Sequence, residues 1–570
     1  MVRGTEARGH LTVHRRVTAG VAVGALVGLI LGLRVLDPQF IAGTGGKWIR
    51  PENDYIAYLV AWHYYVIDAW RLPLFELPAM GYPEGGSVLF NDALPLAVLI
   101  SKALYQATGV RINPFGWWIL LAYVLQGAMA ARIVCAVGVR SIWACGAAAV
   151  LATVNVAFTA RMGHTALSSH FLLLWTIALY FESVRRGRVR AREFVAALAT
   201  ALLVNAYLFA MVLALAIVTV ATLASRGDLR RRDVAALSAG AALVAGLGMV
   251  AGYSVLLARP STMKSEGFGL YSWNLTGLLL PPNGIHGFLA GIPRYGTHGQ
   301  YEGEAYIGGG ALLLLGLCVF TMPTTVRQYL RRHAIFVAAL AALAVYAASN
   351  FVYAGSVLLI QYPLPTLAVE LGNYFRATGR FIWPLAYSLA ILPVALIFRS
   401  WPRRAAAVAA ALIAVGVQLN EASGDLRYRR AVTTRAYEDL IDAPRMRGWL
   451  EQHDRLWQYP SWACGGLVPG RIWPSRDANR ELQVQLEASK AGIPTNSVYT
   501  SRVLKDCSVE AEWSKRPSLE PGVLYVLAPH AVQASPALAG LARSGACVAL
   551  EWATVCSKTW HRAADTADRQ

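Results

Sequence analysis

The sequence predicts a polytopic α-helical membrane protein with about eleven transmembrane helices and a C-terminal extracytoplasmic α/β domain. Of its 570 residues, 56% are hydrophobic and only 15% are charged, whereas soluble domains carry about 25% charged residues. Apolar runs of about twenty residues recur along the chain, and each is long enough to cross the bilayer as a helix. About 150 residues at the C-terminal end are polar and suffice for a separate domain. This composition excludes a disordered chain, a coiled coil and an ordinary soluble enzyme.

The predicted spans begin directly after a basic tail, residues 1–16. The first apolar segment is interpreted as a retained helix, because it lacks the clear small-x-small cleavage site of a signal peptide. The predicted spans are residues 17–36, 115–137, 142–158, 168–184, 193–206, 207–224, 234–257, 306–321, 335–349, 382–398 and 405–419.

Arginines in the short connections set the predicted orientation. The positive-inside rule places the basic tail and these clusters in the cytoplasm, which leaves the C-terminal domain in the periplasm of a bacterial inner membrane. The clusters lie at residues 185–192, 226–232, 327–332 and 399–404. Topology therefore explains most of the formal net charge of +19, and no nucleic-acid partner is expected.

Two apolar segments are ambiguous until this rule is applied. Residues 193–224 lie between two arginine clusters, so they must cross twice, with a turn near 205–207. Residues 93–109 carry Pro95 and Lys102. They are predicted to lie at the outer face or to be re-entrant, because a crossing there would move every later cluster outside.

Three long segments are predicted on the outer side. The transmembrane domain, residues 17–420, carries a first outer loop at 37–114 and a later one at 258–305, and the soluble domain is 421–570. In the soluble domain, a helical pattern alternates with strand-like apolar runs, which indicates a small α/β domain. These segments are a helix at 434–452 and strands at 455–459, 523–528 and 547–552.

Four of the seven cysteines lie in this soluble domain. An even number of cysteines in an extracytoplasmic domain predicts disulfides, with three possible pairings, and buried free thiols are the alternative. The four residues are Cys464, Cys507, Cys547 and Cys556.

Three acids of the first outer loop, Glu52, Asp54 and Asp92, are candidate functional residues. Asp54 opens the aromatic stretch DYIAYLVAWHYY, which is typical of a helix at the water–lipid boundary. Carboxylates there can act as a general base or bind a divalent cation such as Mg²⁺ or Mn²⁺. Solvated loop acids, with Asp54 as a helix N-cap, are the plain alternative. No tandem acidic motif occurs, so the use of a metal stays open.

Two pairs of basic residues are candidates for phosphate binding on the outer side. Arg161 and His164, in NVAFTARMGHTALSSH, share one face if that segment is helical. Arg376 and Arg380, in NYFRATGRFIWP, are four apart and would also share a helical face. Arginine binds phosphate bidentately.

Each pair also has a plain alternative. Arg161 would snorkel to the interface while His164 bonds a backbone carbonyl. Arg376 and Arg380 would form a salt bridge to Glu370 or Glu302 instead. Glu302 itself lies in YEGEAYIGGG, whose glycine run permits close helix approach.

The order of these motifs resembles the GT-C superfamily of membrane glycosyltransferases over roughly residues 40–400. The resemblance rests on DYIAYLVAWHYY, GYPEGGSVLFNDALPL, ARMGHTALSSH, EGEAYIG and FRATGRFIWP. It implies a first span followed by a large outer loop with a catalytic acid. It also implies transfer of a sugar from a polyprenyl-phosphate carrier to an envelope glycan, lipid or protein acceptor.

The resemblance assigns roles to the candidate residues. Asp54 would deprotonate or orient the acceptor hydroxyl, and Asp92 or Glu302 would be a second acid. The carrier phosphate would contact a set of basic residues, namely Arg161, His164, Arg376, Arg380 and, as a weaker candidate, Lys102. A non-catalytic protein that binds a lipid-linked glycan, and a lipid-linked sugar flippase or other transporter, stay open as alternatives. No Walker motif, GxSxG or HExxH occurs, which argues against an ATP-driven pump or a serine hydrolase.

A topology experiment tests the predicted spans. Eleven spans that start in the cytoplasm end outside, so alkaline phosphatase fused after Leu419 is expected to be active. The same enzyme fused after Arg230 is expected to be inactive, because its disulfides do not form in the cytoplasm. An inactive Leu419 fusion beside a stable Arg230 fusion would overturn the eleven-span model.

Overall fold

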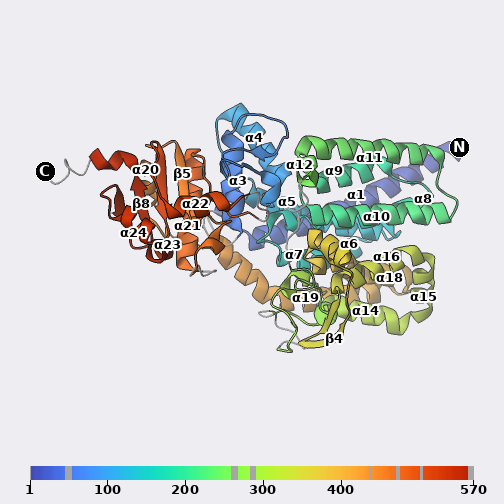
Figure 1. Cartoon of the computed structure of the whole chain (residues 1–570). Helices are drawn as coiled ribbons and strands as arrows, with labels where there is room; N and C mark the ends of the chain where they lie inside the picture. Colours follow the sequence, from blue (N-terminus) through green and yellow to red (C-terminus); the bar gives the residue numbers. More distant parts are fainter. Residues whose placement is uncertain are drawn as a thin grey trace. The chain divides into compact units, whose positions relative to one another are not determined.

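The structure is a computed structural model that describes residues 2–44, 54–258, 267–282, 285, 291–435, 439–469, 475–500 and 505–562. The chain forms two compact units (Figure 1). Unit 1 comprises Met1–Ile41, Gly116–Gly248 and Met263–Thr433. Unit 2 comprises Ala42–Phe115, Met249–Thr262 and Thr434–Gln570. The first outer loop, which the sequence assigned to the transmembrane domain, is thus grouped with the C-terminal region.

Seven described segments are long and apolar enough to cross a membrane, as expected of a multi-span membrane protein. They belong to α1 (Val2–Val35), α5 (Phe115–Ala136), α8 (Phe171–Arg186), α10 (Ala206–Ser225), α11 (Arg231–Ala251), α18 (Trp383–Ser400) and α19 (Arg404–Thr434). The helices α8 and α10 pack against each other.

The other predicted spans also contain helices, but these are shorter or bent. The helices α14 (Gly309–Thr321) and α15 (Pro323–Arg332) qualify as one span only together, and they are bent by 101°. Three more are short, namely α6 (Ile142–Thr153), α9 (Ala191–Leu202) and α16 (Ala334–Ala348). By length and composition the described chain therefore has seven spans, or eight with the bent pair, where the sequence predicted eleven.

The turn expected near residue 205 is present. The helix α9 ends at Leu202, and α10 begins at Ala206. The side chain of Asn205 accepts hydrogen bonds from the backbone N–H groups of Tyr207 and Leu208, which satisfies donors that the start of a helix leaves open. The two helices pack against each other and against α8, so the apolar run 193–224 is a helical pair.

Glycines allow two close backbone approaches in unit 1. A Cβ added at Gly24 or Gly28 of α1 would overlap the carbonyl oxygen of Gly127 or Tyr123 of α5, the geometry of small-residue crossings in membranes. In the predicted glycine run, a Cβ at Gly310 of α14 would overlap a carbonyl of α19. The close helix approach expected from that run is therefore present.

Unit 2 contains a four-stranded sheet in the order β5-β6-β8-β7 (Figure 1). Only β5 and β6 are parallel. The strands are β5 (Arg455–Tyr459), β6 (Val523–Leu527), β7 (Cys547–Ala549) and β8 (Thr554–Ser557). Every residue of β6 is buried, because alternate side chains enter the two apolar cores on either face of the sheet. Three of the four strands lie where the sequence predicted them.

Helices cover both faces of this sheet. Side chains of α20 (Ala443–Leu450) and α21 (Arg476–Ala491) join one core, and those of α22 (Ser508–Lys515), α23 (Pro529–Ala534) and α24 (Pro536–Ala542) border the other. The helix predicted at 434–452 is shorter than expected, since only α20 occupies its second half.

The predicted disulfides are present, and the structure selects one of the three pairings. Cys464 is joined to Cys507, and Cys547 to Cys556. The second bridge links residues that face each other on β7 and β8.

The remaining elements are short. They are α2 (Pro38–Ala42), α3 (Tyr55–Ile67), α4 (Pro95–Thr108), α7 (Val156–Thr159), α12 (Tyr253–Ala258), α17 (Thr366–Gly372), the strand pair β1 (Glu76–Leu77) and β2 (Gly86–Ser87), and the pair β3 (Phe351–Ala354) and β4 (Val357–Gln361). The helix α4 matches the apolar segment that was predicted not to span, and it has only 14 residues.

The glycine crossing predicts a sharp contrast between two alanine variants. Gly28→Ala is expected to destabilise the protein by about 1–3 kcal/mol, because the new methyl forces α1 away from α5. Gly246→Ala in α11 meets no atom within 4 Å and is expected to be neutral or stabilising, since alanine favours helix. Thermal melting of the purified full chain in detergent compares the two, and an unchanged Gly28→Ala midpoint would contradict the close crossing.

Candidate functional site

The acids of the first outer loop are positioned by α3. This helix is apolar on all sides, and eleven of its thirteen residues are buried, because it packs between α4 and α21 within unit 2. The hydroxyl of Tyr64 donates to the carbonyl oxygen of Ile493, just after α21, over 2.5 Å. The aromatic residues expected at the membrane interface thus serve as packing within unit 2.

Asp54 stands at the start of α3, but its carboxylate does not cap the helix. Instead Oδ1 accepts a hydrogen bond of 2.5 Å from the hydroxyl of Tyr499. A bond from a phenol to a carboxylate at this distance is charge-assisted and holds the acid in one orientation. The geometry therefore differs from that of a solvated loop acid or a simple N-cap.

Asp92 is held in a strained backbone conformation near the same place. Its φ of 50° is in the left-handed region, which is costly for a residue with a Cβ and is found often at functional sites. The adjacent Asn91 is buried, and its amide donates to the carbonyl oxygen of Ala57 on α3 over 3.1 Å. The turn is thereby tied to the helix that begins after Asp54.

The two acids lie around one buried tyrosine, Tyr58 of α3. Burial raises the pKa of Tyr58 well above its ordinary value, and the nearby charges of Asp54 and Asp92 raise it further. Tyr58 consequently stays protonated next to both carboxylates. We call Asp54, Asp92, Tyr58 and Tyr499 the acidic site.

Lys102 lies in α4 and is engaged within unit 2. Only 1% of its surface is exposed. Its ammonium donates to the carbonyl oxygen of Ala69 over 3.1 Å and lies 4.3 Å from the ring centroid of Tyr65 and 4.6 Å from that of Trp70. These contacts with one carbonyl oxygen and two aromatic rings explain how a lysine is tolerated in an apolar segment.

A second cluster, in unit 1, surrounds Glu302. Arg161 donates from Nη1 to Glu302 Oε2 over 2.5 Å, and Arg380 donates from Nε to the same oxygen over 3.1 Å. Arg380 Nη2 also lies 3.1 Å from Oε1. All three side chains are at most 8% exposed. We call these three residues the cationic cluster, because two guanidinium groups meet one carboxylate.

The electrostatics of this cluster fix the charge of Glu302. Burial alone would raise the pKa of the carboxyl group, but Arg380 and Arg161 outweigh burial and hold the pKa far below its ordinary range, with His164 adding to the effect. An acid that is this hard to protonate is a poor general base. Of the two candidates for a second catalytic acid, the geometry therefore favours Asp92.

Local sequence explains how the cluster forms. The residues beside Glu302 and Arg380 are Gly303 and Gly379, and a Cβ on either would crowd the backbone of the other. The close approach of these two 3₁₀ turns brings the side chains together. Arg161 also donates from Nη2 to the carbonyl oxygen of Tyr301 over 2.8 Å. The Nε of Arg161 is buried with no hydrogen-bond partner in the described chain.

The two pairs of basic residues lie in irregular backbone. Arg161 and His164 lie in a turn between α7 and a 3₁₀ segment, so the condition of a helical segment is not met there, and the His164 N–H bonds to the Arg161 carbonyl over 2.9 Å. Arg376 and Arg380 are separated by a break at Ala377. Arg376 accordingly lies 5.0 Å from the ring centroid of Tyr271, whereas Arg380 pairs with Glu302, the salt bridge that was the plain alternative.

The structure adds two residues that sequence patterns did not indicate. Tyr499 reaches Asp54 from 445 positions away, and no local pattern reports a contact of that kind. Tyr207 supports Arg380, whose guanidinium lies 4.4 Å from the tyrosine ring centroid. The Tyr207 hydroxyl also accepts from the Ala377 N–H over 3.2 Å. For Tyr207, the only related feature of the sequence was the turn predicted near residues 205–207.

Metal binding stays open. Among the described residues, no group of three or more His, Cys, Asp or Glu side chains is arranged to hold a metal ion. Glu52, a predicted ligand candidate, lies outside the described residues. Asp54 is described, and its Oδ1 is engaged by Tyr499.

Comparisons with known proteins place the chain in a family. Residues 25–423 match the model of DUF6311, a domain of unknown function, and residues 445–558 match the DUF6311 C-terminal domain. The chain belongs to the DUF6311 family. A search of curated proteins finds no match.

Among solved structures, the chain is similar to the oligosaccharyltransferase of Archaeoglobus fulgidus. One match is to that enzyme tethered with an acceptor peptide containing the NVT sequon, with a TM-score of 0.42, 10% identity, and coverage of 90% of this chain and 69% of the other. Another is to AglB of the same organism in complex with an inhibitory peptide and a dolichol-phosphate, with a TM-score of 0.37, 11% identity, and coverage of 89% and 69%.

The cationic cluster predicts that Glu302 is indispensable for stability. Glu302→Gln is expected to cost about 3–5 kcal/mol, because two buried guanidinium groups lose their only shared carboxylate. Glu512→Gln, in an exposed pair with Lys515, is the matched control and is expected to leave stability unchanged. Equal melting temperatures for the two purified variants would refute a structural role for Glu302.

Proposed function

We propose that this protein is a membrane glycosyltransferase that moves a sugar from a polyprenyl-phosphate carrier to an envelope glycan, lipid or protein on the outer face of a bacterial inner membrane. The observation that carries the proposal is the acidic site, in which Asp54 and Asp92 flank the buried Tyr58 and Tyr499 orients Asp54. A fixed carboxylate in a protein with several apolar spans suits an acceptor hydroxyl delivered at the bilayer surface.

The acidic site would supply the base of the reaction. The acceptor oxygen attacks the anomeric carbon, its proton passes to the carboxylate of Asp54, and the bond from the anomeric carbon to the carrier phosphate oxygen breaks. The phosphate leaves with the bonding electrons. The hydrogen bond from Tyr499 keeps Asp54 in one position, and such pre-positioning contributes to rate because no rearrangement is needed at the moment of reaction. Asp92 is the proposed second acid.

The cationic cluster would meet the negative charge of the carrier. Arg161 and Arg380 both pair with Glu302, and guanidinium groups are the donors that suit an anion such as the departing phosphate. Arg161 and Arg380 are the proposed phosphate-binding residues, with His164 and Arg376 in support and Lys102 as the weakest candidate.

Two finer points belong to the same proposal. The eleven-span topology, with the arginine clusters in the cytoplasm, would place both sites on the periplasmic side. A divalent cation at the acidic site is compatible with its chemistry, since carboxylate oxygens are the ligands that Mg²⁺ and Mn²⁺ take. No step described above depends on that cation.

The base role of Asp54 is tested by an isosteric change. Asp54→Asn is expected to reduce sugar transfer by about 100-fold or more, because the amide cannot accept the acceptor proton. Asp68→Asn is a matched control in the same loop, where Asp68 pairs with Arg71 at 2.7 Å, and transfer is expected to persist. The measurement compares surface glycans and lipid-linked sugars in a deletion strain complemented with each variant at equal protein level.

Other outcomes would favour the alternatives. Unchanged surface glycans in the Asp54→Asn strain would contradict the enzyme and favour a binding or assembly protein. If wild-type protein instead only moves the lipid-linked sugar across the membrane, without any change in the acceptor, a transporter is indicated.

A further inference from the structure

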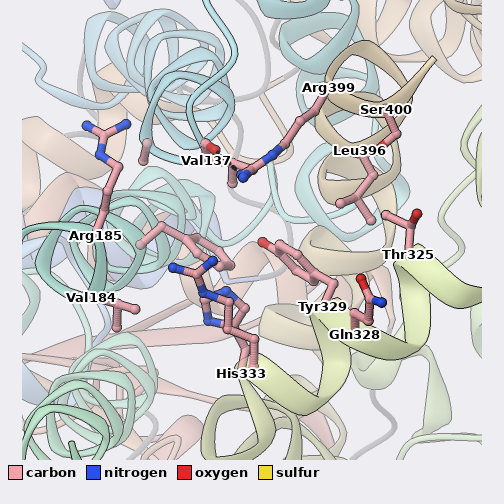
Figure 2. Close-up of a pocket in the computed structure, with 13 residues that line it drawn as sticks. Val137, Val184, Arg185, Thr325, Gln328, Tyr329, His333, Leu396, Arg399 and Ser400 are labelled. Atoms are coloured by element: carbon pink, nitrogen blue, oxygen red, sulfur yellow. Dashed lines mark hydrogen bonds between the residues drawn. The ribbon is translucent and has the colours of Figure 1, made fainter. Parts of the chain in front are cut away.

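A cavity of about 350 Å³ lies in unit 1 where the ends of several helices meet (Figure 2). It is bordered by the end of α5, by α8 and α18, and by α15. Three of its lining residues are arginines, Arg185, Arg332 and Arg399, and Tyr329 and His333 are among the other polar residues that line it. No acidic residue lines it.

Two of the three arginines are held in place by backbone. Arg185 donates from Nη1 to the carbonyl oxygen of Cys135 over 3.1 Å, and Arg399 donates from Nη1 to that of Val137 over 3.0 Å. Both carbonyls belong to the C-terminal end of α5, a position that favours cations. Each guanidinium has five N–H donors, so one carbonyl bond leaves most of each guanidinium available.

These arginines differ from their neighbours in salt bridging, although Glu182 is close enough to Arg185 to act on it electrostatically. Nearby, Arg132 and Arg190 are both paired with Glu182 and with Glu193. No carboxylate in the described chain pairs with the arginines of the cavity. The positive-inside rule concerns only the side of the membrane on which arginines lie. It does not explain why three arginines line the same cavity.

One further group points to an anion. The hydroxyl of Tyr329 is buried without a hydrogen-bond partner in the described chain, and such a donor normally has one. His333 also lines the cavity, and its Nδ1 lies 3.0 Å from the hydroxyl of Tyr180. Figure 2 shows Tyr329, His333 and Arg399 around the same space.

We propose that this cavity binds a phosphoryl group. Its volume lies at the small end of ligand sites and suits a headgroup-sized anion. Basic pockets between helices at the cytoplasmic membrane surface bind the headgroups of acidic lipids, and free phosphate offers the same chemistry. The inference does not depend on the proposed sugar transfer, since none of the cavity residues belongs to the acidic site or the cationic cluster.

The test measures binding to the purified full chain. Phosphatidylglycerol, cardiolipin and phosphatidylcholine are titrated in detergent and followed by native mass spectrometry, and inorganic phosphate is titrated by calorimetry. The double variant Arg332→Gln, Arg399→Gln is expected to weaken binding of the anionic probe at least tenfold. The control Arg327→Gln, Arg331→Gln also removes two positive charges, both from α15, but it spares the cavity, and it is expected to change binding less than twofold.

The outcomes separate the sources of the phosphoryl group. Selective loss of acidic-lipid binding identifies a lipid headgroup, and selective loss of inorganic phosphate identifies a free anion. Equal weakening in both double variants, or no binding of any anionic probe by the wild type, would overturn the proposal. Tyr329→Phe removes one hydroxyl with little risk to folding and is expected to weaken binding about threefold, so a misfolded double variant would not leave the question undecided.

Discussion

The ion pairing of Glu302 with Arg161 and Arg380 is the constraint on which the polar part of unit 1 depends. It joins three segments that are far apart in sequence, and it does so where all three side chains are buried. A buried charge is tolerated only when it is paired and hydrogen-bonded, so the backbone must bring these groups together. The glycines beside Glu302 and Arg380 make that approach possible. Neighbouring contacts extend the network, since Glu304 pairs with Arg294 at 3.0 Å.

This constraint also bears on the proposed chemistry. Because Glu302 pairs with two guanidinium groups, it is a poor candidate for accepting a proton, and we assign the proposed base role to the acids near α3. Those acids are controlled by different means, with a tyrosine hydroxyl on Asp54 and a strained backbone at Asp92. Each of the two sites has its own source of rigidity within its own unit.

The sequence predicted the features that depend on local pattern. Apolar period and length located a helix within every predicted span, the Asn205 turn followed from the arginine clusters on either side, and three strands followed from apolar runs. It could not predict which helices are too short to cross a membrane alone, because tertiary contacts determine where a helix ends. It placed Arg376 and Arg380 on one face, since spacing alone cannot show the break at Ala377. The bond from Tyr499 to Asp54 lay beyond any local pattern.

The arginines show how one residue type acquires different roles within a chain of low charge. Arg132 and Arg190 form salt bridges with a carboxylate, and these salt bridges connect neighbouring segments of the chain. Arg161 and Arg380 both pair with the carboxylate of Glu302, in a buried cluster. Arg185 and Arg399 are fixed by backbone carbonyls, which orient a guanidinium without neutralising it. Since a carbonyl carries only a partial charge, the last arrangement keeps the attraction for an anion almost intact. The identity of the partner, and not the count of arginines, is therefore the basis on which we propose a phosphoryl group at the cavity.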